Sequence, residues 1–219
     1  TNWVFRYRQQ GAEEWIVVPV AQTSLLLEGL SPSTVYEAQV ATQCDPLDPT
    51  AIGDYSRSIS FSTLCEIYSI AEKGDFIEGF EAYQGVAYNV QGVVPICWET
   101  GGTSTYAAPH VVESGTYAYV HEGNNALNFC ASSSSYAYAV LPQFADSLKD
   151  LQISFWAKME NANNGTLYVG YVDSEATFHE LITYTSNTTM TYYESNLSAM
   201  PDEAKSLAFV WENAGTSYY

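Results

Sequence analysis

Hydrophobic and polar residues alternate one by one along several stretches of this chain. In residues 34–42, TVYEAQVAT, Tyr36, Ala38 and Val40 fall on one side, and Glu37 and Gln39 fall on the other. Successive side chains of a β-strand point to opposite faces, so this period predicts a strand. The same reasoning predicts strands at 3–8, 59–63, 136–141, 151–159, 166–172 and 206–211.

Residues that favour turns separate these stretches. Glycine, asparagine, proline and serine gather at 9–11, 28–34, 72–75, 122–125 and 161–165. Only two short segments, 144–148 and 201–204, have a helical pattern. Strands at intervals of about 8–12 residues predict an all-β protein built as a sandwich or a barrel.

The composition narrows the classes of partner. Apolar residues make up 47% of the 219 residues, which is enough for a hydrophobic core. The 25 acidic and 7 basic residues give a net charge of −18, which disfavours nucleic acid and anionic lipid but suits cations such as calcium. No run of about 18 apolar residues is present, so we expect no insertion into a membrane. The residues at both ends of the sequence have the pattern of a strand that is cut off, so we expect this chain to be a segment of a longer protein.

The charge is distributed unevenly along the chain. The first 64 residues carry 3 basic and 7 acidic side chains, whereas the remainder carries 4 basic and 18 acidic ones. This change predicts a domain boundary between Leu64 and Cys65. We therefore expect two modules, 1–64 and 65–219.

The first module contains the pattern Leu30-x-Pro32-x-Thr34-x-Tyr36, followed by alternating residues. It resembles the turn into strand F of fibronectin type III domains. The resemblance implies a buried Tyr36 whose hydroxyl bonds back to the main chain. It also implies a partial sandwich, because no segment here matches the two N-terminal strands of that family.

Seven segments of the second module occur in the order found in a family of bacterial surface modules. They are FIEGFEAY, GVVPICW, HEGNNALNF, YAVLPQF, LQISFWAK, LYVGYV and AKSLAFVW. They resemble the cleaved-adhesin and MAM-like, choice-of-anchor J type modules of such proteins. The resemblance implies a jelly-roll β-sandwich in an extracellular or outer-surface setting. The family's closing strand would follow Tyr219, so the module is expected to lack it.

The four cysteines are Cys44, Cys65, Cys97 and Cys130, and none forms a CxxC motif. An even number in an all-β chain of surface type suggests disulfides, and three pairings are open. The module boundary and the resemblance to bacterial fibronectin modules imply Cys44–Cys65. The second pair would then be Cys97–Cys130.

The common catalytic motifs are absent from the sequence. There is no GxSxG, HExxH, P-loop or GxGxxG. His110, His121 and His179 are scattered, and a nucleophilic Cys97 would need one of the first two as its base. Zinc bound by the widely spaced cysteines has no support from their spacing. We therefore expect no enzymatic activity.

Calcium is the metal that the acidic residues favour, because carboxylate and amide oxygens are its usual ligands. Glu78 and Glu81 lie in the segment IEGFE, and Glu122, Asn124 and Asn125 lie on a turn that contains glycine. In the similar families, the residue matching Glu81 often lies close to a calcium ion. These five residues form the candidate metal site.

Aromatic residues are the candidates for binding a ligand, since the chain has 18 tyrosines and 5 tryptophans. Flat rings pack on the apolar faces of sugars, and neighbouring hydroxyl and amide groups can bond to sugar hydroxyls. Tyrosine is also a favoured strand residue, so each ring could equally be structural. The candidates are Trp98, Tyr117, Tyr119, Tyr184, Tyr192 and Tyr193.

Together these features predict a non-catalytic adhesion or carbohydrate-binding segment of a larger bacterial surface protein. Its partner would be a glycan or a host surface or extracellular-matrix protein. One alternative is an accessory segment of a secreted protease or glycosidase whose catalytic domain lies outside this chain. Another is a structural stalk without a ligand.

Overall fold

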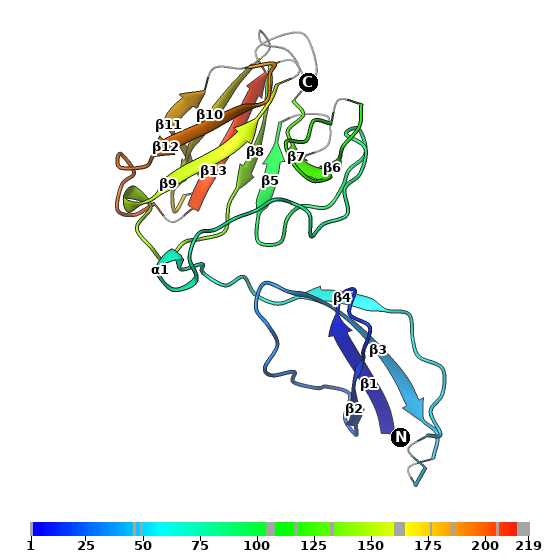
Figure 1. Cartoon of the computed structure of the whole chain (residues 1–219). Helices are drawn as coiled ribbons and strands as arrows, with labels where there is room; N and C mark the ends of the chain where they lie inside the picture. Colours follow the sequence, from blue (N-terminus) through cyan, green and yellow to red (C-terminus); the bar gives the residue numbers. More distant parts are fainter. Residues whose placement is uncertain are drawn as a thin grey trace. The chain divides into compact units, whose positions relative to one another are not determined.

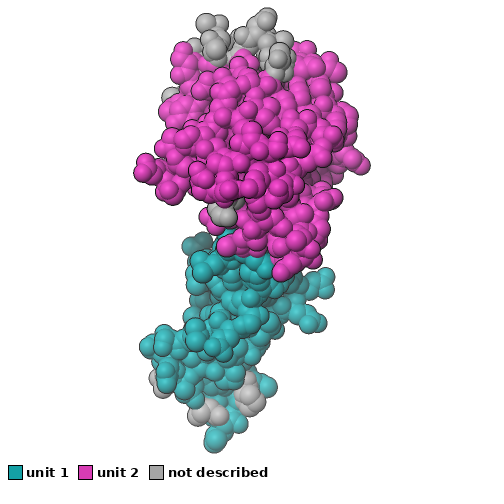
Figure 2. Space-filling view, turned by 90° about the vertical axis from the view of Figure 1, so that its left-hand side faces the viewer, with its two compact units in different colours: residues 1–66 teal, residues 67–219 magenta. Residues whose placement is uncertain are grey.

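The computed structural model divides the chain into two compact units, residues 1–66 and 67–219, coloured separately in Figure 2. The division falls two residues after the expected boundary at Leu64. Each unit is described by itself. The structure describes residues 2–45, 47–48, 50–103, 108–116, 118–131, 134–159, 165–175, 177–184, 187–204 and 206–213.

The first unit is a four-stranded antiparallel sheet with the order β2-β1-β3-β4. Apolar and polar residues alternate in β3, where Tyr36 and Ala38 are buried and Glu37 and Gln39 are partly exposed. The strands are β1 (Asn2–Gln9), β2 (Ile16–Val20), β3 (Val35–Gln43) and β4 (Ile59–Ser62).

Tyr36 fixes one corner of this sheet. Its side chain is only 4% exposed, and its ring stacks on Phe61 with the centroids 5.6 Å apart. Its hydroxyl accepts a hydrogen bond from the backbone amide of Ser31 at 3.0 Å. The predicted packing role of Tyr36, with its bond back to the main chain, is therefore confirmed.

The polar face of the first unit carries a ladder of cations and rings. The Arg6 guanidinium lies 4.4 Å from the centre of the Trp15 ring and 3.6 Å from that of Tyr55. The Arg8 guanidinium lies 4.2 Å from the centre of the Trp15 ring and pairs with Glu37 at 2.7 Å. The hydrogen bond from Arg8 lowers the pKa of the Glu37 carboxyl. These contacts stabilise the outer surface of the sheet.

The second unit contains a five-stranded antiparallel sheet with the order β11-β10-β13-β8-β5 (Figure 1). A β-bulge between Val169 and Gly170 shifts the register of β10 against β11. The strands are β5 (Glu99–Gly102), β8 (Ser135–Val140), β10 (Gly165–Val172), β11 (Phe178–Tyr184) and β13 (Ser206–Asn213).

Two two-stranded sheets complete the second unit, namely β12-β9 and β6-β7. The inward-facing Phe155 of β9 meets Phe209 of β13 edge to face, with the ring centroids 5.1 Å apart. The hydrophobic core lies between these layers and includes Val169 and Trp211. The strands are β6 (His110–Glu113), β7 (Asn125–Asn128), β9 (Gln152–Ala157) and β12 (Thr191–Asn196). The predicted all-β sandwich fold is confirmed.

Helical structure is short and differs from the prediction. A four-residue helix, α1 (Ile70–Lys73), was not expected, and its amides at Ile70 and Ala71 donate to the Asp146 carboxylate. A 3-10 turn, η1 (Leu148–Asp150), begins at the last residue of the expected helical segment 144–148, and residues 201–204 form only a turn. Within the described residues, no helix has the length and apolar character needed to cross a bilayer.

The cysteine pairing differs from both predicted disulfides. Cys65 and Cys97 are the disulfide-bonded residues, whereas Cys44 and Cys130 carry thiols. The antiparallel register explains why Cys44–Cys65 is wrong. Val35 at the start of β3 pairs with Ser62, so Cys65 follows at that end of the sheet, and Cys44 follows the opposite end of the nine-residue strand. Such a strand spans about 30 Å, while a disulfide needs Cα atoms within about 7 Å.

The predicted pair Cys97–Cys130 is wrong for a second reason. Cys97 takes part in the observed disulfide, and Cys130 lies in the interior with 3% of its surface exposed. Burial raises the pKa of the Cys130 thiol. That environment favours a protonated and unreactive thiol.

Candidate functional site

The outer face of β9 and β12 combines exposed rings with polar groups. In β9, Ile153 and Phe155 point toward the core and the alternate residues are exposed. In β12, Tyr193 likewise packs inward and its neighbours are exposed. The register places three exposed pairs side by side, and we call these six residues the outer strip: Trp156 and Tyr192, Ser154 and Glu194, and Gln152 and Asn196.

Trp156 is the centre of the aromatic part of the outer strip. Trp156 and Tyr192 are each 47% exposed, and their ring centroids lie 5.5 Å apart. The His121 ring stacks on Trp156 with the centroids 3.8 Å apart and the planes at 15°. Three rings from distant parts of the sequence thus form one continuous aromatic surface.

Polar groups border these rings. The Tyr192 hydroxyl donates a hydrogen bond to Glu194 Oε2 at 2.8 Å, which holds the carboxylate beside the ring. Ser154, Gln152 and Asn196 continue the exposed row along the two strands. A ligand lying on the rings would therefore meet both hydrogen-bond donors and acceptors.

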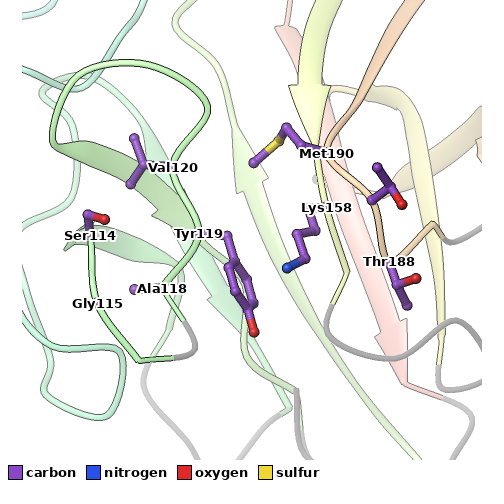
Figure 3. A pocket seen from close by; sticks show the side chains of 9 residues that line it. Ser114, Gly115, Ala118, Tyr119, Val120, Lys158, Thr188 and Met190 are labelled. Carbon is purple, nitrogen blue, oxygen red and sulfur yellow. The ribbon is translucent and has the colours of Figure 1, made fainter.

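A pocket of about 470 Å³ lies beside the outer strip (Figure 3). Lys158 follows the last residue of β9, and its Nζ lies 3.1 Å from the centre of the Tyr119 ring. Figure 3 shows the Lys158 amine directed toward the Tyr119 ring. The other lining residues are Ser114, Gly115, Ala118, Val120, Thr188, Thr189 and Met190.

A larger cavity of about 900 Å³ adjoins this region. Its lining combines core rings such as Phe155 and Phe209 with the surface residues Tyr119, His121 and Trp156. It therefore extends from the space between the layers to the aromatic surface.

Two of the predicted ligand-binding tyrosines lie in this region. Tyr119 is 39% exposed and lines the pocket, and Tyr192 belongs to the outer strip. Tyr117 lies outside the described residues.

Of the other three predicted rings, Tyr184 is buried, and Tyr193 and Trp98 are partly buried against the core. Tyr184 is 8% exposed, and its hydroxyl donates to Ser195 Oγ at 2.7 Å. Tyr193 stacks on Phe155, and Trp98 packs edge-on against Phe80 and the core. Tyr184 and Tyr193 thus contribute to the packing of the core, whereas Trp98 packs against the core and also lines the larger cavity of about 900 Å³.

The sequence prediction missed Trp156 and Lys158, although the pattern contains a signal for Trp156. In residues 151–159, Leu151, Ile153 and Phe155 form the apolar row. The alternate row is polar except for Trp156. A large ring on the polar side of a strand is a candidate for an exposed binding residue.

The residues of the predicted calcium site are partly brought together. Glu81 Oε1 accepts hydrogen bonds from the backbone amides of Asn124 and Asn125, at 2.9 and 2.8 Å. Gly123 has a φ of 75°, and a Cβ there would lie 2.5 Å from Glu81 Oε1, so glycine allows the turn to close on the carboxylate. Glu78 instead accepts from the amide of Phe80 at 2.6 Å.

The fifth residue of that set, Glu122, lines the larger cavity. In the described part of the chain, no group of three or more histidine, cysteine, aspartate or glutamate side chains is arranged to hold a metal. Calcium binding at Glu81 therefore stays a prediction from the sequence.

Comparison with known proteins gives only distant matches. No family model and no curated protein matches the chain. One similar structure is the enzymatically active domain of tailspike protein 4 of bacteriophage CBA120, with a TM-score of 0.37 and 15% identity. That match covers 56% of this chain and 18% of the tailspike chain.

Two further similar structures are carbohydrate-binding modules. The family 11 module of the cellulase Lic26A-Cel5E of Clostridium thermocellum has a TM-score of 0.34 and 15% identity, over 61% of this chain and 87% of that one. A module of the β-sandwich superfamily described as promiscuous in specificity has a TM-score of 0.41 and 12% identity, over 100% and 81%. At these scores the likeness carries no information about ligand or activity.

Proposed function

We propose that the second unit binds carbohydrate without catalysis, on the outer strip of β9 and β12. The observation that carries the proposal is the exposed pair Trp156 and Tyr192, set beside Glu194 on a regular sheet. A sugar ring has apolar C–H faces and a polar rim of hydroxyls. The aromatic surface suits the faces, and the row of carboxylate, amide and hydroxyl groups suits the rim.

The outer strip is open, so it would bury only part of a sugar. We therefore expect a dissociation constant of roughly 10 μM to 1 mM, which corresponds to about −7 to −4 kcal/mol. Because strands rather than loops carry the site, little conformational entropy should be lost on binding.

An extracellular setting in a larger bacterial surface protein forms part of this proposal. The disulfide-bonded state of Cys65 and Cys97 supports it, since disulfides persist mainly in oxidising compartments. The identification of the two units as fibronectin type III-like and adhesin-like modules also belongs to the proposal.

Binding of the full 219-residue chain to a glycan array, followed by calorimetry on the hits, tests this function. Trp156→Ala should weaken binding at least about tenfold, because it removes the largest ring of the surface. Tyr136→Ala is the matched control, since Tyr136 is a 39% exposed ring on β8 outside the outer strip. Equal losses in both variants, or no bound glycan, would contradict the proposed site.

The same protein separates the alternative functions. Release of new reducing ends from a bound glycan would show catalysis and would contradict the non-catalytic proposal. Binding to an extracellular-matrix protein that Trp156→Ala does not affect would place adhesion on another surface. If the chain binds neither glycans nor matrix proteins, the result would favour a structural stalk.

A further inference from the structure

Lys158 continues the alternation of β9 beyond its last residue and is partly buried. Gln152, Ser154 and Trp156 occupy alternate exposed positions, and Lys158 follows at the next position of the same alternation. It lines the pocket of about 470 Å³, a volume within the range of about 300–1,000 Å³ of small-molecule sites. The amine and the aromatic surface therefore belong to one binding region.

Lys158 is one of the few basic residues of this chain. Only 7 of the 219 residues are lysine or arginine, against 25 acidic residues. Elsewhere in the described residues, Lys149 pairs with Asp202 and Arg8 pairs with Glu37. No carboxylate among the described residues lies within 4 Å of Lys158 Nζ, and none lines the pocket of about 470 Å³. The larger cavity, which Lys158 also lines, includes Glu122 and Glu194.

The neighbours of Lys158 hold it in place without neutralising its charge. The ring of Tyr119 lies under the ammonium group, a cation–π contact that restricts the long side chain. Ser114, Thr188 and Thr189 add hydroxyl groups to the walls of the pocket. An ammonium has three N–H donors and no acceptor, so this arrangement suits an anionic oxygen group.

We propose that the glycan bound at the outer strip carries a carboxylate, as in a hexuronic acid, and that Lys158 binds that carboxylate. The inference rests on the carbohydrate-binding function proposed above. The sugar ring would lie on Trp156 and Tyr192, with its acidic group directed along β9 into the pocket. The hydroxyls of Tyr119 and of the two threonines are within the same lining and supply further hydrogen bonds.

The net charge of the whole chain limits how many acidic groups the bound glycan can carry. The net charge of −18 repels a ligand that carries many negative charges. At physiological ionic strength, salt screens interactions between charges more than about 8 Å apart, so a single carboxylate in contact with Lys158 would still be attracted. We therefore infer an occasional acidic residue in a largely neutral glycan rather than a densely sulfated one.

Calorimetry with the full chain and two matched oligosaccharides tests this inference. The probes are an oligomer of galactose and an oligomer of equal length in which one galactose is replaced by galacturonic acid, at low and high salt. The wild type should prefer the acidic oligomer about tenfold, and high salt should reduce that preference. Lys158→Met should bind both oligomers with similar affinity. Lys149→Met, which removes an exposed lysine from η1, should behave as the wild type.

The outcomes distinguish this inference from the function on which it rests. If the wild type and Lys158→Met bind the acidic oligomer equally, the role of Lys158 is overturned while carbohydrate binding stands. If a sulfated oligomer binds and the uronate does not, the carboxylate assignment is overturned. If neither variant binds any oligomer on an array, the proposed function fails, and this inference fails with it.

Discussion

The Glu81 carboxylate accepts a hydrogen bond from the backbone amide of Asn125 at 2.8 Å, which joins positions 44 residues apart. The Asn125 side-chain amide in turn donates hydrogen bonds to the backbone carbonyl oxygens of Phe80 and Tyr83, at 3.1 and 2.9 Å. The segment around Glu81 is therefore tied to the turn before β7 by bonds in both directions. This reciprocity makes Glu81 a structural residue even without a metal.

Glu81→Ala should lower the free energy of unfolding by about 1–2 kcal/mol, because two backbone amides lose a charged acceptor. Glu81→Gln should cost less, since its amide oxygen can still accept. Urea unfolding of both variants measures the difference. Equal stability of Glu81→Ala and the wild type would contradict the structural role.

The calcium prediction has its own measurement. If calcium binds at Glu81, adding it should raise Tm, a chelator should reverse the rise, and Glu81→Gln should remove it. The variant is a suitable control because it keeps the size of the side chain. An unchanged Tm at saturating calcium would exclude the site.

The sequence predicted local features well and long-range ones poorly. Alternation identified the strands that contain Tyr36, Phe155 and Val169, because each pattern is complete within one segment. It could not assign Tyr184 or Tyr193 to a face, since both lie in a run where rings and polar residues mix. Trp156 meets Tyr192 only through the register of β9 with β12, which no local pattern encodes.

The thiols offer a direct test of the cysteine pairing. One thiol, Cys44, should react rapidly with a labelling reagent in the native protein because it is exposed. Cys130 should react only on unfolding, since it is buried and its pKa is raised. Two further thiols should appear on reduction. Mass spectrometry after labelling counts them, and finding no thiol in the unfolded, unreduced protein would contradict this pairing.

Tyr36→Phe should lower the free energy of unfolding by about 1–2 kcal/mol. The substitution leaves the Ser31 amide without its acceptor and keeps the packing of the ring. Tyr7→Phe is the matched control, because the Tyr7 ring packs 6.2 Å from that of Tyr36 and its hydroxyl makes no hydrogen bond within the described residues. Equal losses for both variants would rule out a specific role for the corner hydrogen bond.

Acid should weaken the hairpin that joins β10 to β11. Asp173 pairs with His179 at 2.7 Å, and this bond, with the amide of Thr177, lowers the pKa of the Asp173 carboxyl. A lowered folded-state pKa stabilises the protein at neutral pH, and the contribution disappears as pH falls through that pKa. The stability difference between the wild type and Asp173→Asn should therefore shrink in acid. Thermal unfolding from pH 7 to pH 3 measures it, and a difference independent of pH would contradict the linkage.

The outer strip has a consequence for how the protein could be assayed. Its two halves come from β9 and β12, while the two strands between them in the chain, β10 and β11, belong to the other sheet. Neither half could recognise a sugar as a short peptide, so a bound sugar reports that the entire module has folded. By mass action, a ligand at a hundred times its dissociation constant adds about 2.7 kcal/mol to the native state. A sugar whose millimolar dissociation constant is too weak for a pull-down would thus raise Tm in a thermal unfolding assay when it is present well above that constant.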